Sequence, residues 1–311
     1  MVVIDPWGAL PLSPPLPRVP ISSNARYSFP ALARSPTFDS IVLGTSSARL
    51  LQPVELNPGF DAHFANLAMN SATAYEQSRM FDLFLRWHPA PRVVIVSLDQ
   101  AWCSETFERF TPRPFPEWMY QQNRWAGYRE MLTPYAVQEA WNQLMVMAGL
   151  KRRRYGLDGY TSFVPPDSQY DRVRRDRAFE RWPSLDRTPA PADAVPLYAA
   201  LPLLDRMLGD LPPVTRKILY FTPTHIDQQG APGSRTAWRL AHCKDEVRDI
   251  AGRRGAALLD FEFPSAITRD RDNFWDPVHY RQAIATIVTQ ALISFRSPDA
   301  VVLTAPPSAS R

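Results

Sequence analysis

The chain has 311 residues, which is long enough for one large domain with an insertion. Apolar residues make up 45% of it and charged residues 21%, a composition that is typical of packed globular proteins and excludes a disordered chain. The 35 basic and 31 acidic side chains leave a net charge of only +4, so no nucleic-acid partner is expected. The densest basic segments, 151–154 and 172–177, are interpreted as solvated, anion-tolerant surface.

The two cysteines, Cys103 and Cys243, could form one disulfide, but two cysteines alone do not define a redox compartment. His and Cys residues do not recur at the spacing of metal ligands, and we expect neither a metal nor another cofactor. No apolar run approaches the roughly 20 residues that a membrane span needs. The first residues also lack the charged start and the long apolar core of a signal peptide.

Residues 1–38 are rich in proline, which fixes φ and removes a backbone donor. We therefore expect an extended arm there, neither a helix nor a central strand. The prolines are Pro6, Pro11, Pro14, Pro15, Pro17, Pro20, Pro30 and Pro36. At the other end of the chain, residues 299–311 are expected to form a flexible tail.

Residues 39–298, between the arm and the tail, predict one α/β domain. Short apolar segments that predict strands alternate with segments of helical periodicity. The expected strands are 39–44, 63–68, 93–96, 217–221 and 256–260, and the expected helices are 75–87, 235–252 and 279–294. This alternation predicts a three-layer, doubly wound parallel sheet of five strands in the flavodoxin-like order 2-1-3-4-5. Ligands of such sheets bind at the carboxyl ends of the strands.

Residues 101–195 interrupt the alternation and are too long for a simple crossover between two strands. The segment is rich in tryptophan and arginine, and residues 134–150 predict a helix within it. We interpret it as a helical insertion that could cover the ligand-binding edge of the sheet. Its side chains at Trp118, Arg124, Trp125 and Tyr128 could contact a sugar, or they could form the core of the insertion itself.

A serine follows the first expected strand, in the segment Gly44-Thr45-Ser46-Ser47. A serine in such a turn lies at the edge of the sheet, beside a helix amino terminus whose free N–H groups favour a developing oxyanion. The same residues are equally typical of a helix N-cap.

Asp276-Pro277-Val278-His279 precedes the last expected helix. A serine hydroxyl becomes a useful nucleophile when an imidazole accepts its proton, and an acid must hold that imidazole in the right tautomer. Aspartate three residues before histidine can do this within one turn. The alternative is that Asp276 caps the helix and His279 is a polar residue of its first turn.

The loop after the second expected strand contains Asn70 and Ser71, which could direct an amide and a backbone N–H toward an oxyanion. It could also be an ordinary polar loop. His225 follows the fourth expected strand at the same edge of the sheet. It could bind substrate or be a structural histidine.

Together, these ordered segments resemble the SGNH/GDSL hydrolase superfamily over residues 39–295, with the insertion excluded. The resemblance implies that Ser46 is the nucleophile, Asp276 the orienting acid and His279 the general base. It also implies that Ser71 stands where the family usually has a glycine whose N–H joins the oxyanion hole. Asp99 lies where the family usually has Gly-x-Asn-Asp, so the usual asparagine donor is absent or replaced.

Three further segments resemble bacterial cell-envelope members of that superfamily that are linked to O-acylation of surface polysaccharides. They are residues 5–8, 221–225 and 276–281. This likeness implies an esterase or acetyltransferase that acts on a carbohydrate ester, a location in the cell envelope or periplasm, and a membrane acyltransferase partner. The alternative is a non-catalytic carbohydrate-binding or polysaccharide-assembly factor on the same fold.

Overall fold

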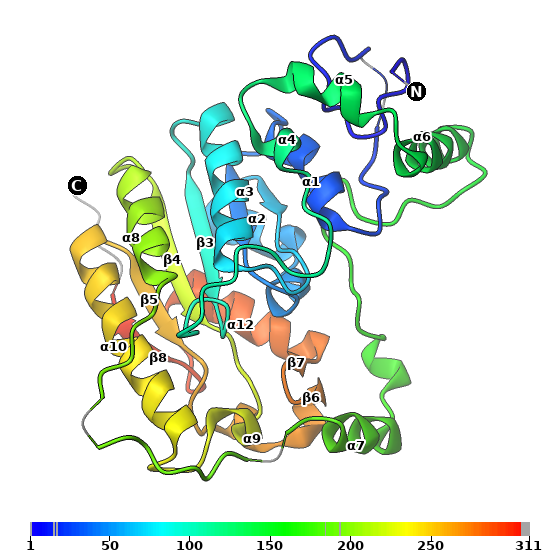
Figure 1. Ribbon diagram of the computed structural model, residues 1–311. Helices are drawn as coiled ribbons and strands as arrows, with labels where there is room; N and C mark the ends of the chain where they lie inside the picture. The colour runs from blue at the N-terminus through cyan, green and yellow to red at the C-terminus, as the bar shows by residue number, and fades with distance from the viewer. Residues whose placement is uncertain (1, 15, 17, 184, 193, 306–311) are drawn as a thin grey trace.

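The computed structural model describes residues 2–14, 16, 18–183, 185–192 and 194–305. Its centre is a six-stranded sheet in the order β2-β1-β3-β4-β5-β8 (Figure 1). The first five of these strands in the chain run parallel, and β8 pairs antiparallel with β5. The predicted α/β fold with a mainly parallel sheet is confirmed, with one strand more than expected. The strands are β1 Ser40–Leu43, β2 Phe64–Asn66, β3 Val93–Leu98, β4 Arg216–Phe221, β5 Ala257–Asp260 and β8 Val301–Thr304, and a separate hairpin contains β6 Phe274–Asp276 and β7 His279–Tyr280.

Helices lie on both sides of the sheet, and others build a lobe beside it (Figure 1). The α-helices are α1 Ala25–Ala33, α2 Pro53–Phe60, α3 Ala74–Trp87, α4 Glu117–Tyr120, α5 Gly127–Glu130, α6 Pro134–Met147, α7 Arg172–Glu180, α8 Leu201–Asp210, α9 Ile226–Gln229, α10 Arg235–Arg254, α11 Ala266–Arg269 and α12 Gln282–Ser294. Short 3-10 turns cover Ser47–Leu50, Arg124–Ala126, Asp167–Gln169 and Arg271–Asn273.

The strands separate two apolar cores because successive side chains of a strand point to opposite faces. In β1, Ile41 and Leu43 enter a core shared with α3, α8 and α10, while Val42 enters a core shared with α2 and α12. All residues of β3 are buried. Its uninterrupted apolar start is therefore explained by helices on both faces, as expected for a parallel strand.

The expectation of an extended arm is wrong for Ala25–Ala33, which form α1 although Pro30 lies inside this helix. Proline cannot donate to the carbonyl four residues earlier, which here belongs to Arg26. The buried hydroxyl of Tyr120 donates to that carbonyl instead, at 2.8 Å. A tertiary contact from the insertion thus replaces the missing helical bond, and local sequence rules do not anticipate it.

The arm and the first part of the insertion pack together into the lobe at the top right of Figure 1, which contains α1 and α4 to α6. Trp7 is buried there against Tyr27 and Tyr135, with ring centroids 5.1 and 5.8 Å apart. Arg124 donates to the backbone carbonyl of Ala9 at 2.8 Å. Only part of the insertion is helical, and Arg124 serves the packing of the lobe.

One link connects the end of the chain to the sheet, and a second connects the insertion to α10. Val301–Thr304, within the expected flexible tail, form β8 on the edge of β5, whereas residues 306–311 lie outside the described residues. The run Val-Val-Leu-Thr favours a strand once a free sheet edge is available. Cys103 and Cys243 form a disulfide, with Cα atoms 5.6 Å apart, that joins the start of the insertion to α10.

Candidate active site

The turn after β1 is shaped by Gly44, whose φ of +153° is rare for residues with a side chain. A Cβ at this position would lie 2.6 Å from the Cβ of Ala48 and 2.7 Å from that of Ser97. Glycine therefore allows β1 to turn tightly against β3. Ser46 follows at the start of a 3-10 turn and makes no side-chain capping bond within the described chain. Its hydroxyl is free for another partner.

That partner is His279: Ser46 Oγ lies 2.7 Å from Nε2 of its imidazole. The other ring nitrogen, Nδ1, lies 2.7 Å from Oδ2 of Asp276. The second carboxylate oxygen of Asp276 accepts the backbone N–H groups of Val278 and His279, both at 3.0 Å. The carboxylate is thus held in place by the backbone while it orients the imidazole. The three side chains have the connectivity of a Ser-His-Asp triad.

Asp276 and His279 are not in a helix, contrary to the expected helix over 279–294. They belong to the small β6–β7 hairpin, and α12 begins only at Gln282. The hairpin is fastened to the serine turn, because Ser47 Oγ donates to the carbonyl of Val278 at 3.0 Å. A hairpin held in this way presents the imidazole directly to Ser46.

Ser71 occupies the loop after β2 and has a φ of +52°, a left-handed conformation that is uncommon for residues other than glycine. Ser71 and Ser46 line the same cavity. Arg26 supports the loop, since its guanidinium donates to the carbonyls of Asn70 and Ser71 at 3.2 and 3.4 Å. Arg26 is itself paired with buried Glu76. These contacts fix the backbone of the loop beside Ser46.

The side chain of Asn70 is oriented by Arg49, whose Nη1 donates to Oδ1 of the amide. Asn66, at the end of β2, also links this loop to the serine turn. Its Nδ2 donates to the carbonyls of Ala48 and Leu51 at 2.9 and 2.8 Å. The supporting roles of Arg49 and Asn66 were not predicted from the sequence. Neither the residue type nor the position distinguishes a side chain that supports the site from one that lies on the surface.

Asp99 directly follows β3 and lines the same cavity, at the position where the family that the sequence resembles usually has an asparagine donor. Its carboxylate accepts hydrogen bonds from the hydroxyl of Thr45 and, at 2.9 Å, from the N–H of Ala101. Burial raises the pKa of the Asp99 carboxyl, and these two hydrogen bonds oppose the shift. Asp99 therefore holds Thr45, the residue before Ser46, in place.

His225 is not among the described residues that line this cavity. Its side chain is buried between Phe179 and Phe274, at ring centroid distances of 5.0 and 5.9 Å. Burial lowers the pKa of the imidazole. Its backbone N–H donates to the carbonyl of Pro277 at 2.8 Å. His225 thus supports the Asp276–His279 turn from behind, and the structural alternative describes it better than substrate binding.

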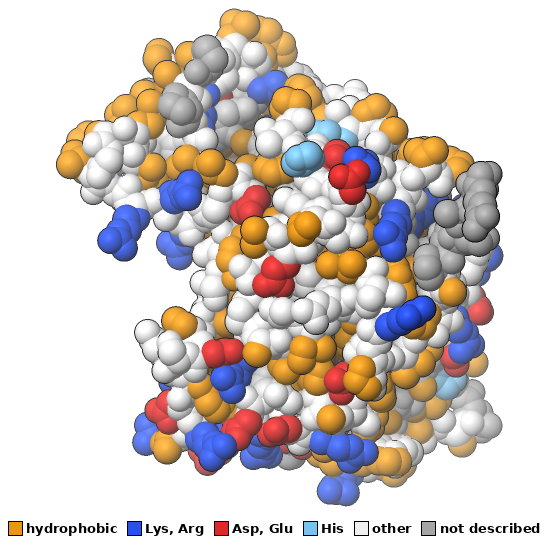
Figure 2. Space-filling model, turned by 180° about the vertical axis from the view of Figure 1, so that it is seen from behind, with side chains coloured by type: hydrophobic (Ala, Val, Ile, Leu, Met, Phe, Trp, Pro, Cys, Tyr) orange, Lys and Arg blue, Asp and Glu red, His pale blue; other side chains and the backbone are white. Residues whose placement is uncertain are grey.

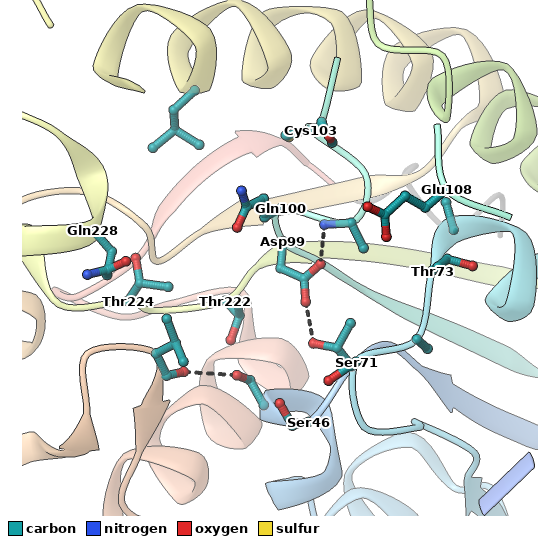
Figure 3. A pocket seen from close by; sticks show the side chains of 18 of the residues that line it. Ser46, Ser71, Thr73, Asp99, Gln100, Cys103, Glu108, Thr222, Thr224 and Gln228 are labelled. Carbon is teal, nitrogen blue, oxygen red and sulfur yellow. Dashed lines mark hydrogen bonds between the residues drawn. The ribbon is translucent and has the colours of Figure 1, made fainter. Parts of the chain in front are cut away.

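The cavity beside Ser46 has a volume of about 980 Å³ and lies at the carboxyl ends of the strands. Figure 3 shows Ser46, Ser71 and Asp99 among the side chains that surround it. The insertion supplies much of the wall, from residues 101–113 and from Trp182. Many lining side chains carry hydroxyl, carboxyl or amide groups.

Phe163, also from the insertion, packs its ring edge-on against the imidazole of His279 with the centroids 5.2 Å apart. The side chains of His279 and Asp276 remain 21% and 23% exposed, so reactants can reach them. Trp118, Arg124, Trp125 and Tyr128 are not among the described residues of the cavity wall. The sugar-contact alternative for these four side chains is not supported at this cavity.

Within the described ranges, no group of three or more His, Cys, Asp or Glu side chains is arranged to hold a metal ion. None of the described helices combines the length and the apolar character that a membrane span requires. No protein-family model matches the sequence, and a comparison with curated proteins found no significant match.

Proposed function

We propose that this chain is a serine-dependent acyl ester hydrolase or acyltransferase of the SGNH type that acts on a carbohydrate ester. The observation that carries the proposal is the 2.7 Å contact between Ser46 Oγ and His279 Nε2, backed by the contact of equal length from His279 to Asp276. A base within hydrogen-bond reach of a hydroxyl, oriented in turn by an acid, is the arrangement that activates serine.

In the proposed reaction, Nε2 of His279 accepts the proton of Ser46 as Oγ attacks the ester carbonyl carbon. The carbonyl oxygen becomes an oxyanion, for which the backbone N–H groups of Ser46 and Ser71 are the proposed donors. The carbonyl then re-forms, the bond to the alcohol oxygen breaks, and His279 returns the proton to the leaving alcohol. Water or a sugar hydroxyl then attacks the acyl carbon of the acyl-serine while His279 accepts its proton. The bond between the acyl carbon and Ser46 Oγ breaks, and His279 returns that proton to Oγ, which regenerates Ser46.

A carbohydrate substrate is supported by hydroxyl side chains in the cavity wall, including Thr73, Thr222 and Thr224, with Trp182 as an aromatic surface. The Cys103–Cys243 disulfide is compatible with the cell envelope or periplasm, because disulfides persist in oxidising compartments. A membrane acyltransferase as donor of the acyl group belongs to the same proposal and rests on the resemblance alone.

The second candidate function is a non-catalytic carbohydrate-binding or polysaccharide-assembly factor. One observation favours it: Asp99 accepts hydrogen bonds at the position where an asparagine would donate one to an oxyanion. Such a factor would keep the cavity without catalysing acyl transfer.

Labelling with a fluorophosphonate probe, combined with hydrolysis of p-nitrophenyl acetate, separates the two functions. The hydrolase should be labelled at Ser46, and Ser46→Ala should abolish both labelling and hydrolysis. Ser35→Ala, which changes a serine in the loop after α1, serves as the matched control and should retain both. Absence of labelling in the wild-type protein, or labelling that persists in Ser46→Ala, would overturn the proposed hydrolase function.

A further inference from the structure

A second cavity, of about 670 Å³, lies on the other side of the Asn70–Ser71 loop. Three arginines line it: Arg49, Arg113 and Arg154. Its described lining contains no aspartate or glutamate. Three cations that share one cavity without a lining carboxylate repel one another, and this cost is removed when an anion binds among them.

Arg49 is the buried member of the group, with only 6% of its surface exposed. Its Nη1 is used by Asn70, whereas its buried Nε has no hydrogen-bond partner within the described chain. The guanidinium lies over the rings of Tyr155 and Phe163, at 5.7 and 5.3 Å from their centroids. Burial lowers the pKa of Arg49, and the neighbouring Arg154 and Arg113 lower it further. A buried donor without a partner is costly and can be satisfied by a ligand.

Several contacts connect this cavity to the triad. Arg113 lines both cavities, so the two adjoin. Asn70 faces the second cavity and Ser71 the first, from adjacent positions of one loop. Phe163 lines the second cavity and packs against His279. Figure 2 shows the molecule hollowed between the lobe that carries α1 and α4 to α6 and the rest of the chain, with Lys and Arg side chains along the rim of the hollow.

We propose that this second cavity is a subsite for an anionic group, a carboxylate or a phosphate, of the substrate that presents its ester to Ser46. The inference rests on the proposed function, which it narrows to esters of acidic carbohydrates. Arginine suits this role because its planar guanidinium can donate two parallel hydrogen bonds to either anion. The subsite would also fix the register of a chain-like ligand across the Ser71 loop.

Calorimetric titration of the full chain with unacylated probes tests the subsite without requiring hydrolysis. One pair of probes is trigalacturonic acid and its uncharged triamide, and the other is glucose 6-phosphate and glucose. We expect the charged member of one pair to bind at least about tenfold more tightly than its uncharged counterpart, as a charge-assisted hydrogen bond provides. The pair that shows the preference identifies carboxylate or phosphate as the anion.

The variant Arg113→Gln/Arg154→Gln changes two exposed side chains of the cavity and should abolish the preference. Arg152→Gln/Arg153→Gln removes the same charge from neighbouring exposed positions outside the described lining and should retain it. Equal affinity of the wild-type protein for charged and uncharged probes, including no binding of either, would overturn the proposal. Equal loss in the two double variants would also overturn it, because that result indicates a diffuse charge effect.

The same titration separates this subsite from the proposed chemistry. Ser46→Ala should keep the preference for the anion, since binding needs no nucleophile. If the protein shows the preference for the anion but is never labelled by a fluorophosphonate, the proposed subsite stands and the proposed hydrolase activity is overturned. If the protein is labelled but shows no preference for the anion, the proposed hydrolase activity stands and the proposed subsite is overturned.

Discussion

The hydroxyl of Tyr280 donates a 2.8 Å hydrogen bond to the backbone carbonyl of Ser47, 233 positions earlier in the chain. Both groups are buried, and each is adjacent to a member of the triad. Burial raises the pKa of Tyr280, so the phenol stays protonated and remains a donor. This contact and the one from Ser47 to Val278 hold the nucleophile turn and the His279 hairpin together.

Tyr280→Phe should therefore destabilise the protein by about 1–2 kcal/mol, because a buried carbonyl loses its partner while the ring volume is kept. Urea unfolding measures this change. The Ser46–His279 contact is held by other groups as well, so ester hydrolysis by the folded variant should fall by less than in Asp276→Asn. A variant as stable as the wild-type protein would contradict the role assigned to this bond.

Asp276→Asn tests whether the acid orients the imidazole. An amide keeps the shape of the side chain but can leave His279 in the wrong tautomer, and the expected loss in kcat is about 10⁴-fold. The thermal midpoint should change little, because the side-chain oxygen can still accept the N–H groups of Val278 and His279. Hydrolysis of p-nitrophenyl acetate gives the rate, and circular dichroism gives the midpoint. A rate within about tenfold of the wild-type rate would exclude a catalytic Asp276.

Because Ser71 has a positive φ, two substitutions at this position can separate the role of its backbone N–H from the role of its side chain. Ser71→Gly should hydrolyse ester at the wild-type rate, since glycine adopts this conformation readily and keeps the N–H. Ser71→Val keeps the N–H as well, but a β-branched residue resists a left-handed φ and should turn the donor away. We expect a loss of about 100-fold or more in kcat for the valine variant. Equal activity of both variants would show that this N–H does not serve the oxyanion.

The contact between Ser46 and His279 was expected from the ordered segments taken together with the family resemblance, because each segment alone was also typical of a helix cap. Ser46 follows the first strand, and Asp-x-x-His lies before the last helix. The apolar run that begins β3 likewise identified a strand buried on both faces. Both inferences depend on patterns that are local in sequence, and the general architecture then brings the segments together.

Features that depend on distant partners were not predictable in this way. Pro30 argues against a helix until Tyr120 supplies a donor to Arg26. The β8 segment resembles a loose tail until the edge of β5 is present. The Nε of Arg49, which has no hydrogen-bond partner within the described chain, is a property of the folded cavity, and its sequence neighbours give no sign of it.

The Cys103–Cys243 disulfide closes a loop with a sequence separation of 140 residues, which includes nearly all of the insertion. Replacing both cysteines by serine should lower the free energy of unfolding by about 2–5 kcal/mol. Differential scanning calorimetry of wild type and variant, each with and without reductant, measures the loss. Reductant should destabilise the wild-type protein alone. A wild-type midpoint that is insensitive to reductant under denaturing conditions would contradict a stabilising disulfide.

Glu262 lines the main cavity, where Thr224 donates to its carboxyl group at 2.9 Å. Burial raises the pKa of Glu262 from 4.5 to about 7, and the nearby Lys244 only partly opposes this shift. At a pH between 4.5 and about 7, this carboxyl therefore binds a proton more readily in the folded state than in the unfolded state. Its contribution to stability is therefore complete below about pH 4.5 and is lost as the pH rises through about 7.

Glu262→Gln keeps an acceptor for Thr224 but cannot titrate. The free energy of unfolding of the wild-type protein, taken relative to this variant, should therefore decrease by about 1–3 kcal/mol between pH 4.5 and 8. Urea unfolding at a series of pH values measures the difference, and all other titrating groups cancel in the comparison. Glu180→Gln, at the exposed carboxyl-terminal end of α7, serves as a control with the same change in charge. A difference for Glu262→Gln that stays constant with pH, or increases, would show that this carboxyl is ionised in the folded protein throughout.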